Sequence, residues 1–415
     1  MQIKKHLSFG ALRKMLSERF LSIKDHRQSG KIKHTLHDCM MSGFAMMFYQ
    51  DPSLLQFQKR LQEAVHTNNL YTLFKVQYIP KDTQMRDVID EVDSRELEPL
   101  FEYFFSPLQR GKPLEGYRVL DKYIASMDGS GYFSSDKICC PGCLRKEGKK
   151  GNVRYEHQIV QAAIVHPDKR QVIPLATEEV KNTDGTDKQD CEINAGKRLI
   201  KKIRQSHPKL PLIIVTDSLQ SKQPFIEGLK EEDMRYILVA KPEDHKILME
   251  WVNEQRQLAE MSRLEIKDHK GRLHVYEWIN EVPLNGNEDT IWVNYFEYWL
   301  INKGKVTYHN SWVTDFTVHE DNVTKLVRLG RCRWKIENET FNTLKNQGYH
   351  IEHNFGHGKK HLSMNFFLLN LLAFFMHQIF ELTDKLYQAC RNHFGSKRNL
   401  WDHLRVSIRI ISHLQ

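Results

Sequence analysis

The chain has 415 residues, of which 40% are hydrophobic and 27% charged, and this composition excludes a largely disordered protein. Lys and Arg outnumber Asp and Glu by 61 to 52, and the resulting net charge of +9 favours a polyanionic partner. Seven cysteines without an export signal at the N-terminus indicate reduced thiols or metal ligands in the cytoplasm. The most apolar run, 366–376, is too short to span a bilayer and predicts a buried helix instead.

The first part of the chain, residues 1–115, predicts an N-terminal helical domain. Apolar residues recur at helical spacing over 12–23 and 40–48, and two further helices are expected to start near Asp51 and Asp82. Basic and His residues gather between the first two helices, over 24–37. They fit either a solvated charged surface or a DNA-contacting one.

Residues 116–258 predict a sheet with crossover helices. Strands are expected over 123–127, 158–166, 171–175, 211–217 and 236–240, with a turn at 129–131, a polar loop at 182–190 and a helix over 187–204. The order β-β-β-α-β-α-β is that of an RNase H-like sheet. The predicted fold class is therefore α/β, with an RNase H-like mixed sheet flanked by helices.

The rest of the chain predicts three more segments. Alternating strands at 273–278, 290–298 and 306–312 indicate a β-strand insertion over 259–318. A helical pattern from 320 to 347 lies in the second part of the core, 319–360. The C-terminal region, 361–415, is expected to be helical and is a candidate for dimerisation.

Three acidic residues are candidates for metal-dependent phosphoryl transfer. Asp128 and Asp217 each end an apolar strand, and Glu337 lies on a later helix. Such a carboxylate cluster suits Mg²⁺, and two ions about 3.5–4 Å apart can activate an attacking oxygen and stabilise a leaving one. Arg333 shares a helix face with Glu337 and could hold a phosphate, or the two could form an ordinary surface ion pair.

Three sequence blocks around these acids, 127–133, 215–218 and 333–338, resemble the catalytic blocks of bacterial insertion-sequence DDE transposases. They are most similar to the group with a β-strand insertion and a Tyr–Arg–Glu–Lys signature. The blocks 79–86, 188–192 and 348–354 add to the resemblance, which extends over about residues 75–375.

The resemblance implies an enzyme that cleaves and transfers DNA strands at the ends of its own element, by a cut-and-paste route. It implies two Mg²⁺ (or Mn²⁺) ions, double-stranded DNA with terminal inverted repeats, a target DNA and a homodimer working on paired ends. By position, Asp128, Asp217 and Glu337 would bind the metals, and Arg333 and Lys345 would complete the catalytic set. An RNase H-like nuclease without strand transfer and an inactive DNA-binding relative are the alternatives.

The match to the signature has two departures. Gly330 stands where the signature has Tyr, and Leu344 stands where it has Lys, with Lys345 one residue later. A slip of one residue turns a helical side chain by about 100°. Glu339, with Lys335 four residues before it, competes with Glu337 as the third acid.

The resemblance also suggests residues that contact DNA. In relatives a tryptophan of the β insertion stacks on a flipped base, an interaction worth about 1–3 kcal/mol, and Trp278, Trp292, Trp299 and Trp312 are the candidates here. Four histidines at 350, 353, 357 and 361 lie in a segment rich in Gly and Lys that fits the DNA backbone. The predicted DNA contacts are Arg333, Lys335, Lys345, His353, His357, Trp292, Trp299 and Trp312.

A Cys-x-x-Cys pair suggests a second, structural metal site. Cys140 and Cys143, together with His157 and Cys191, could bind zinc in tetrahedral geometry. One such pair is a weak signal, and reduced thiols are the alternative.

Overall fold

The computed structural model describes residues 5–61, 70–148, 151–181 and 190–411. In this part of the chain eleven strands form one mixed sheet, and its path runs β3-β4-β2-β6-β7-β11-β10-β9-β8. Off this path, β1 pairs with β2 and β5 pairs with β4. The strands are β1 (Arg118–Val119), β2 (Lys122–Ser135), β3 (Leu144–Glu147), β4 (Val153–His166), β5 (Lys169–Val180), β6 (Leu212–Thr216), β7 (Arg235–Val239), β8 (Ser262–Lys267), β9 (Leu273–Pro283), β10 (Trp292–Asn302) and β11 (Lys305–Thr314).

Half of this sheet has the RNase H-like order. β5, β4 and β2 pair antiparallel, and β6 and β7 follow parallel to β2. The two parallel connections are made by α7 (Glu192–Ser206) and α8 (Gln223–Glu231), whose apolar faces are buried. The predicted fold class, an α/β protein with a mixed sheet flanked by helices, is confirmed.

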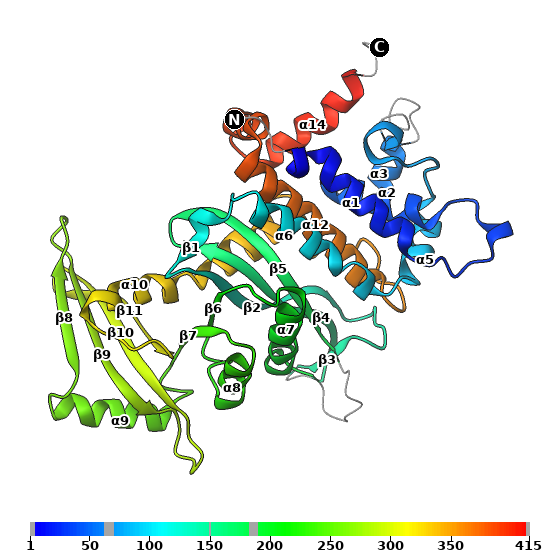
Figure 1. The fold of residues 1–415 in the computed structure, drawn as a ribbon. Coiled ribbons are helices and arrows are strands. Elements are labelled where there is room, and N and C mark those ends of the chain that lie inside the picture. The colour runs from blue at the N-terminus through cyan, green and yellow to red at the C-terminus, as the bar shows by residue number, and fades with distance from the viewer. Residues whose placement is uncertain (1–4, 62–69, 149–150, 182–189, 412–415) are drawn as a thin grey trace.

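The β insertion extends the same sheet and does not form a separate one. β11 pairs antiparallel with β7, from Trp312 opposite Val239 to Thr314 opposite Ile237, and β10, β9 and β8 follow (Figure 1). α9 (Lys246–Gln257) leads into this part. β8 was not predicted, because nearly all of its side chains are exposed and it has no alternating apolar pattern.

The remaining helices surround one long apolar helix, α12 (Leu362–Thr383), which packs on α2, α5, α6 and β5 (Figure 1). α12 is long and apolar enough to cross a membrane, but 83% of its most apolar stretch is buried inside the protein, as in a core helix. The predicted N-terminal and C-terminal regions therefore share a hydrophobic core. The helices here are α1 (Phe9–Ser22), α2 (Leu36–Phe48), α3 (Leu54–Leu61), α5 (Asp82–Asp90), α6 (Pro99–Arg110), α13 (Lys385–Phe394) and α14 (Lys397–Ile411).

One local prediction was wrong, and another was confirmed only in part. The expected turn at 129–131 is part of β2, because its backbone pairs with β4 along the whole segment, with a register shift between Gly131 and Phe133. The expected helix over 320–347 is broken into α10 (Glu320–Arg331), a π-helical segment η6 (Ile336–Phe341) and α11 (Asn342–Asn346). The predicted loop at 182–190 lies, except for Asp190, outside the described residues, as does the start of the helix predicted from 187.

Candidate active site

The first two candidate acids lie on neighbouring parallel strands. β2 and β6 pair in register through Ser126 opposite Val215, two residues before Asp128 and Asp217. Paired strands are about 4.8 Å apart, so both carboxyl groups emerge at the same point of the sheet. Burial raises the pKa of Asp128 to about 6, with the negative charges of Asp217 and Glu337 acting in the same direction and the attraction of Arg333 opposing them.

The third acid reaches this point through Arg333. Arg333 Nη1 donates to Asp128 Oδ2 at 3.1 Å, and its Nη2 lies 3.8 Å from Glu337 Oε2. The turn before η6 is fixed to β2, because Ser126 Oγ donates to the Arg333 carbonyl at 3.2 Å. Glu337 stands in the first turn of a π-helix, a form that is frequent at functional sites. Arg333 thus links Asp128 to Glu337, and Asp217 lies near enough for its charge to act on Asp128.

The competing acid, Glu339, turns away from this group. Arg170 Nε lies 3.4 Å from Glu339 Oε2, and the charge of Glu339 acts on Lys397 of the C-terminal helices. Glu337 is therefore the acid whose position fits the cluster with Asp128.

A fourth carboxylate, Glu192, lies in the same place and was not predicted. A Cβ at Gly129 would be 2.4 Å from Glu192 Oε2, so the carboxyl group packs directly on the backbone beside Asp128. Burial raises the pKa of Glu192, and the charges of Asp128 and Asp217 raise it further. Its place in the block 188–192 was the only signal in the sequence.

The two predicted lysines have other partners. Lys335 is only 5% exposed, and its Nζ donates to the Lys169 carbonyl at 2.7 Å, so the prediction that it contacts DNA was wrong. Lys345 Nζ pairs with Glu352 Oε1 at 2.9 Å. Its predicted role stays a prediction.

The tryptophans of the insertion differ in exposure. Trp312 is fully buried and stacks on Phe296 with ring centroids 5.2 Å apart, so it cannot stack on a base and that prediction was wrong. Trp299 is half-buried and stacks on His309, whereas Trp292 is 60% exposed. For Trp292 and Trp299 the predicted base contact stays a prediction. Trp278 is buried.

The buried Trp312 also explains the departure from the family signature at Gly330. A Cβ at Gly330 would be 2.6 Å from Trp312 Nε1. Because the indole occupies this space, a tyrosine cannot be accommodated without displacing it.

The cysteines and histidines form a cluster that differs from the predicted one by one residue. The donor atoms of Cys140, Cys143, His157 and His357 all lie within 4.8 Å of one another. Cys191 is exposed at the N-cap of α7 and is not among them, so the prediction that Cys191 is the fourth ligand was wrong. His357 is buried in the cluster, so the prediction that it contacts DNA was wrong. His353 is exposed, and its contact with DNA stays a prediction.

Comparison with known proteins decides the family. Residues 139–376, more than half of the chain, match the family model described as the transposase DDE domain. The chain belongs to this transposase family. A search of curated proteins gives no match. Among solved structures it is similar to a cryo-EM structure of the piggyBac transposase synaptic complex with hairpin DNA, at 11% identity and a TM-score of 0.40, over 97% of this chain and 80% of that one.

The transposase family match contains Asp217, Arg333 and Glu337 but begins after Asp128. The place of Asp128 in the site therefore rests on the sheet: it lies on β2, beside β6, and binds Arg333. The match also contains all four residues of the Cys–His cluster.

Proposed function

We propose that this chain is an active cut-and-paste DDE transposase that cleaves DNA at the ends of its insertion sequence and joins them to a target. The observation that carries the proposal is the ion-pair chain from Asp128 through Arg333 to Glu337, beside the strand β6, which ends one residue before Asp217. The charges of two acids from distant parts of this transposase-family chain, Asp217 and Glu337, thus act on Asp128.

The acids suit the divalent cations that this family generally uses. Carboxylate oxygens are hard ligands that Mg²⁺ or Mn²⁺ prefers. The raised pKa of Asp128 reflects burial beside other negative charges, a situation that a bound cation relieves. Two such ions, when bound, supply activation of the attacking oxygen and stabilisation of the leaving one.

The side chains around the acids have their own tasks in this proposal. Arg333 holds Asp128 in place and offers its planar fork to a phosphate of the scissile strand. Glu192 adds a carboxylate to the same cluster, next to Gly129. Lys345, His353, Trp292 and Trp299 are proposed to contact the DNA around the cleavage point.

The proposed substrates are double-stranded DNA with the terminal inverted repeats of the element and a target DNA, in the cytoplasm. The net charge of +9 supports binding to a polyanion. We further propose a homodimer, because joining two element ends needs two sites that act together.

A cleavage assay tests the assignment. Labelled duplexes that carry the DNA bordering the gene are incubated with Mg²⁺ and wild-type protein, Asp217→Asn, Glu337→Gln or Glu339→Gln. We expect the first two variants to lose at least about a hundredfold in rate, which corresponds to about 2.7 kcal/mol of barrier. Glu339→Gln is the matched control, because it makes the same change two residues away on a side chain that pairs with Arg170. Equal losses in both Glu variants would reject the site.

A second assay separates transposase from nuclease. A pre-cleaved end with a free 3′-hydroxyl is mixed with supercoiled plasmid, and the joined product is measured. A transposase joins the two molecules, whereas a nuclease only cuts them. Cleavage without any joined product would favour the nuclease, and no cleavage by the wild type would favour the inactive relative.

A further inference from the structure

We propose that Cys140, Cys143, His157 and His357 bind one structural zinc ion. The ion would join the loop between β2 and β3, the strand β4 and the segment that follows the catalytic Glu337. This site is separate from the carboxylate cluster and goes beyond the proposed DNA chemistry.

The distances between the donor atoms fit a single tetrahedral ion. Zinc bonds of about 2.3 Å to sulfur and 2.0–2.1 Å to nitrogen imply separations of about 3.8 Å for S···S, 3.5 Å for S···N and 3.4 Å for N···N. The two Sγ atoms are 3.8 Å apart, and the two imidazole Nε2 atoms 3.2 Å. The Sγ-to-Nε2 distances are 3.4 Å from Cys140 to His157, 3.4 Å from Cys143 to His157 and 3.3 Å from Cys143 to His357.

Other uses of these residues fit less well. A disulfide needs sulfur atoms about 2.05 Å apart, and these are 3.8 Å apart. A two-iron cluster would bind the cysteines and the histidines on different irons, whereas here all four donor atoms lie within 4.8 Å of one another. Two thiolates and two imidazoles are a common ligand set for structural zinc.

The histidines are oriented as metal ligands usually are. His357 Nδ1 lies 3.0 Å from the Gly358 carbonyl, so Nδ1 can donate there and leave Nε2 free for a metal. His157 Nδ1 lies 3.4 Å from Glu179 Oε1, and Lys181 pairs with the other oxygen of Glu179 at 2.9 Å. Both imidazoles are at least 90% buried.

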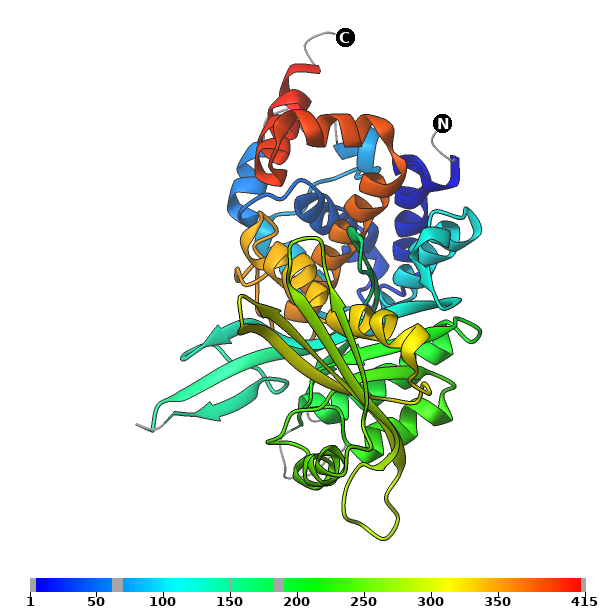
Figure 2. The same ribbon diagram turned by 90° about the vertical axis from the view of Figure 1, so that its left-hand side faces the viewer.

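The backbone around the cysteines also has a form that suits a metal. The amide of Cys143 donates to the Cys140 carbonyl at 3.1 Å, and the amide of Cys140 points to Cys143 Sγ at 3.4 Å. Both Sγ atoms are thereby turned to the same side, toward His157 of β4. β3 and the ends of β2 and β4 project beyond this point as an arm (Figure 2).

The fourth ligand is brought in from 200 residues away by contacts with α5. Asp90 accepts the amides of residues 359–362 at 2.8–3.0 Å, and Arg86 Nε donates to the Phe355 carbonyl at 3.1 Å. Gly358 has a φ of +68°, and a Cβ there would be 2.3 Å from Asp90 Oδ1. These contacts fix the backbone on both sides of His357.

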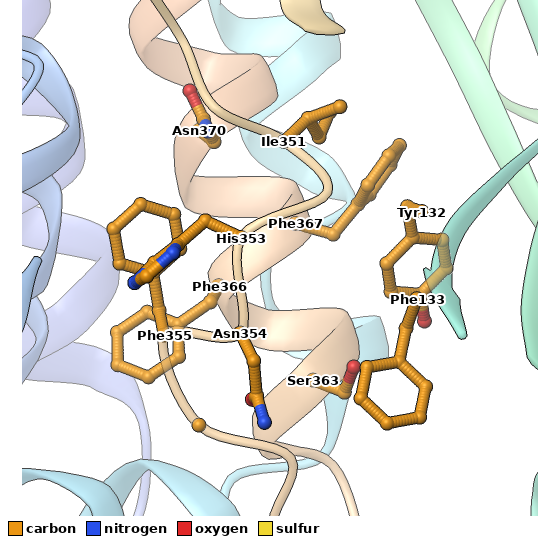
Figure 3. A pocket seen from close by; sticks show the side chains of 11 residues that line it. Tyr132, Phe133, Ile351, His353, Asn354, Phe355, Ser363, Phe366, Phe367 and Asn370 are labelled. Carbon is orange, nitrogen blue, oxygen red and sulfur yellow. The ribbon is translucent and has the colours of Figure 1, made fainter. Parts of the chain in front are cut away.

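Figure 3 shows the surroundings of this segment, which runs over α12 opposite Tyr132 and Phe133 of β2. The ring of Phe133 lies 4.4 Å from that of His357. Because β2 carries Asp128 and the His357 segment follows Glu337, the ion would brace two parts of the active site against each other. Its function would be structural, since all four positions are occupied by protein ligands.

Metal analysis of the full-length protein tests the proposal. We expect elemental analysis of protein purified with zinc to find about one zinc per chain, and Co²⁺ in its place to give the intense visible bands of a tetrahedral site with sulfur ligands. Cys143→Ser and His357→Ala should lose the metal. Cys139→Ser and Cys191→Ser are matched controls and should keep it, because both cysteines lie outside the cluster.

Several outcomes would overturn the site. Wild-type protein without zinc after loading would do so, as would an octahedral Co²⁺ spectrum. Loss of zinc in Cys191→Ser with retention in His357→Ala would show that the fourth ligand is wrong. If His357→Ala fails to fold, His357→Cys replaces it and should retain one zinc, because it keeps a ligand. Metal content is measured without DNA, so failure of the transposase assignment would leave this result unaffected.

Discussion

Replacement of Asp128 by Asn should stabilise the metal-free protein at neutral and alkaline pH. The carboxyl group is buried beside Asp217 and Glu337, and its side chain is only 20% exposed. An amide of the same shape removes the buried negative charge. Carboxylates gathered for metal binding thus reduce stability when the metal is absent.

The magnitude follows from the pKa of Asp128. This pKa is about 6 in the folded protein and near 3.8 in the unfolded chain, and each unit corresponds to about 1.4 kcal/mol, so ionisation costs about 3 kcal/mol. Because the folded pKa is the higher one, the wild type has its full stability below pH 3.8. It loses this contribution as the pH rises through 6. Asp128→Asn should therefore exceed the wild type by about 3 kcal/mol at pH 8 and approach it near pH 4.

Urea unfolding with EDTA, at several pH values, measures the difference directly. An unfolding entropy of about 2.1 cal/mol/K per residue makes 3 kcal/mol equal to about 3 °C in Tm for this chain. Addition of Mg²⁺ should stabilise the wild type and leave Asp128→Asn nearly unchanged. If the stability difference between Asp128→Asn and the wild type is no larger at pH 8 than at pH 4, the carboxylate cluster is refuted.

Two other substitutions test how the site is held. Asp90→Ala should lower the free energy of unfolding by about 2 kcal/mol, the upper end for an N-terminal cap, as measured by urea unfolding. Burial raises the pKa of Asp90, but hydrogen bonds from backbone amides outweigh it and lower the pKa. This contribution to stability is therefore present at neutral pH and is lost as the pH falls through the folded pKa. Gly330→Ala should cost about 1–3 kcal/mol by forcing Trp312 to move. Gly10→Ala in α1, where a Cβ meets no atom, is its control, and an equal loss there would contradict the packing argument.

The strands that carry or precede Asp128 and Asp217 could be predicted from the sequence, because a strand's burial pattern is local; Asp128, expected at the end of its strand, lies inside β2. The apolar runs before Asp128 and Asp217 gave the strands, and the order of elements gave the RNase H-like sheet. The strand β8 and the path of β2 through 129–131 could not be predicted. Both depend on pairing with a neighbour, which supplies hydrogen bonds that the local sequence does not encode.

The directions of side chains were decided by tertiary structure. The break before η6 changes the helical phase, so periodicity could not distinguish Glu337 from Glu339 or show that Lys335 is buried. His357 joins the cysteines, and Cys191 does not, because α5 holds the segment around residue 357 against β2 and β4. The sequence alone determined which chemical groups were present near each strand and helix end. Long-range contacts between elements determined which of those groups meet, since sequence spacing gives no information on distances between separate elements.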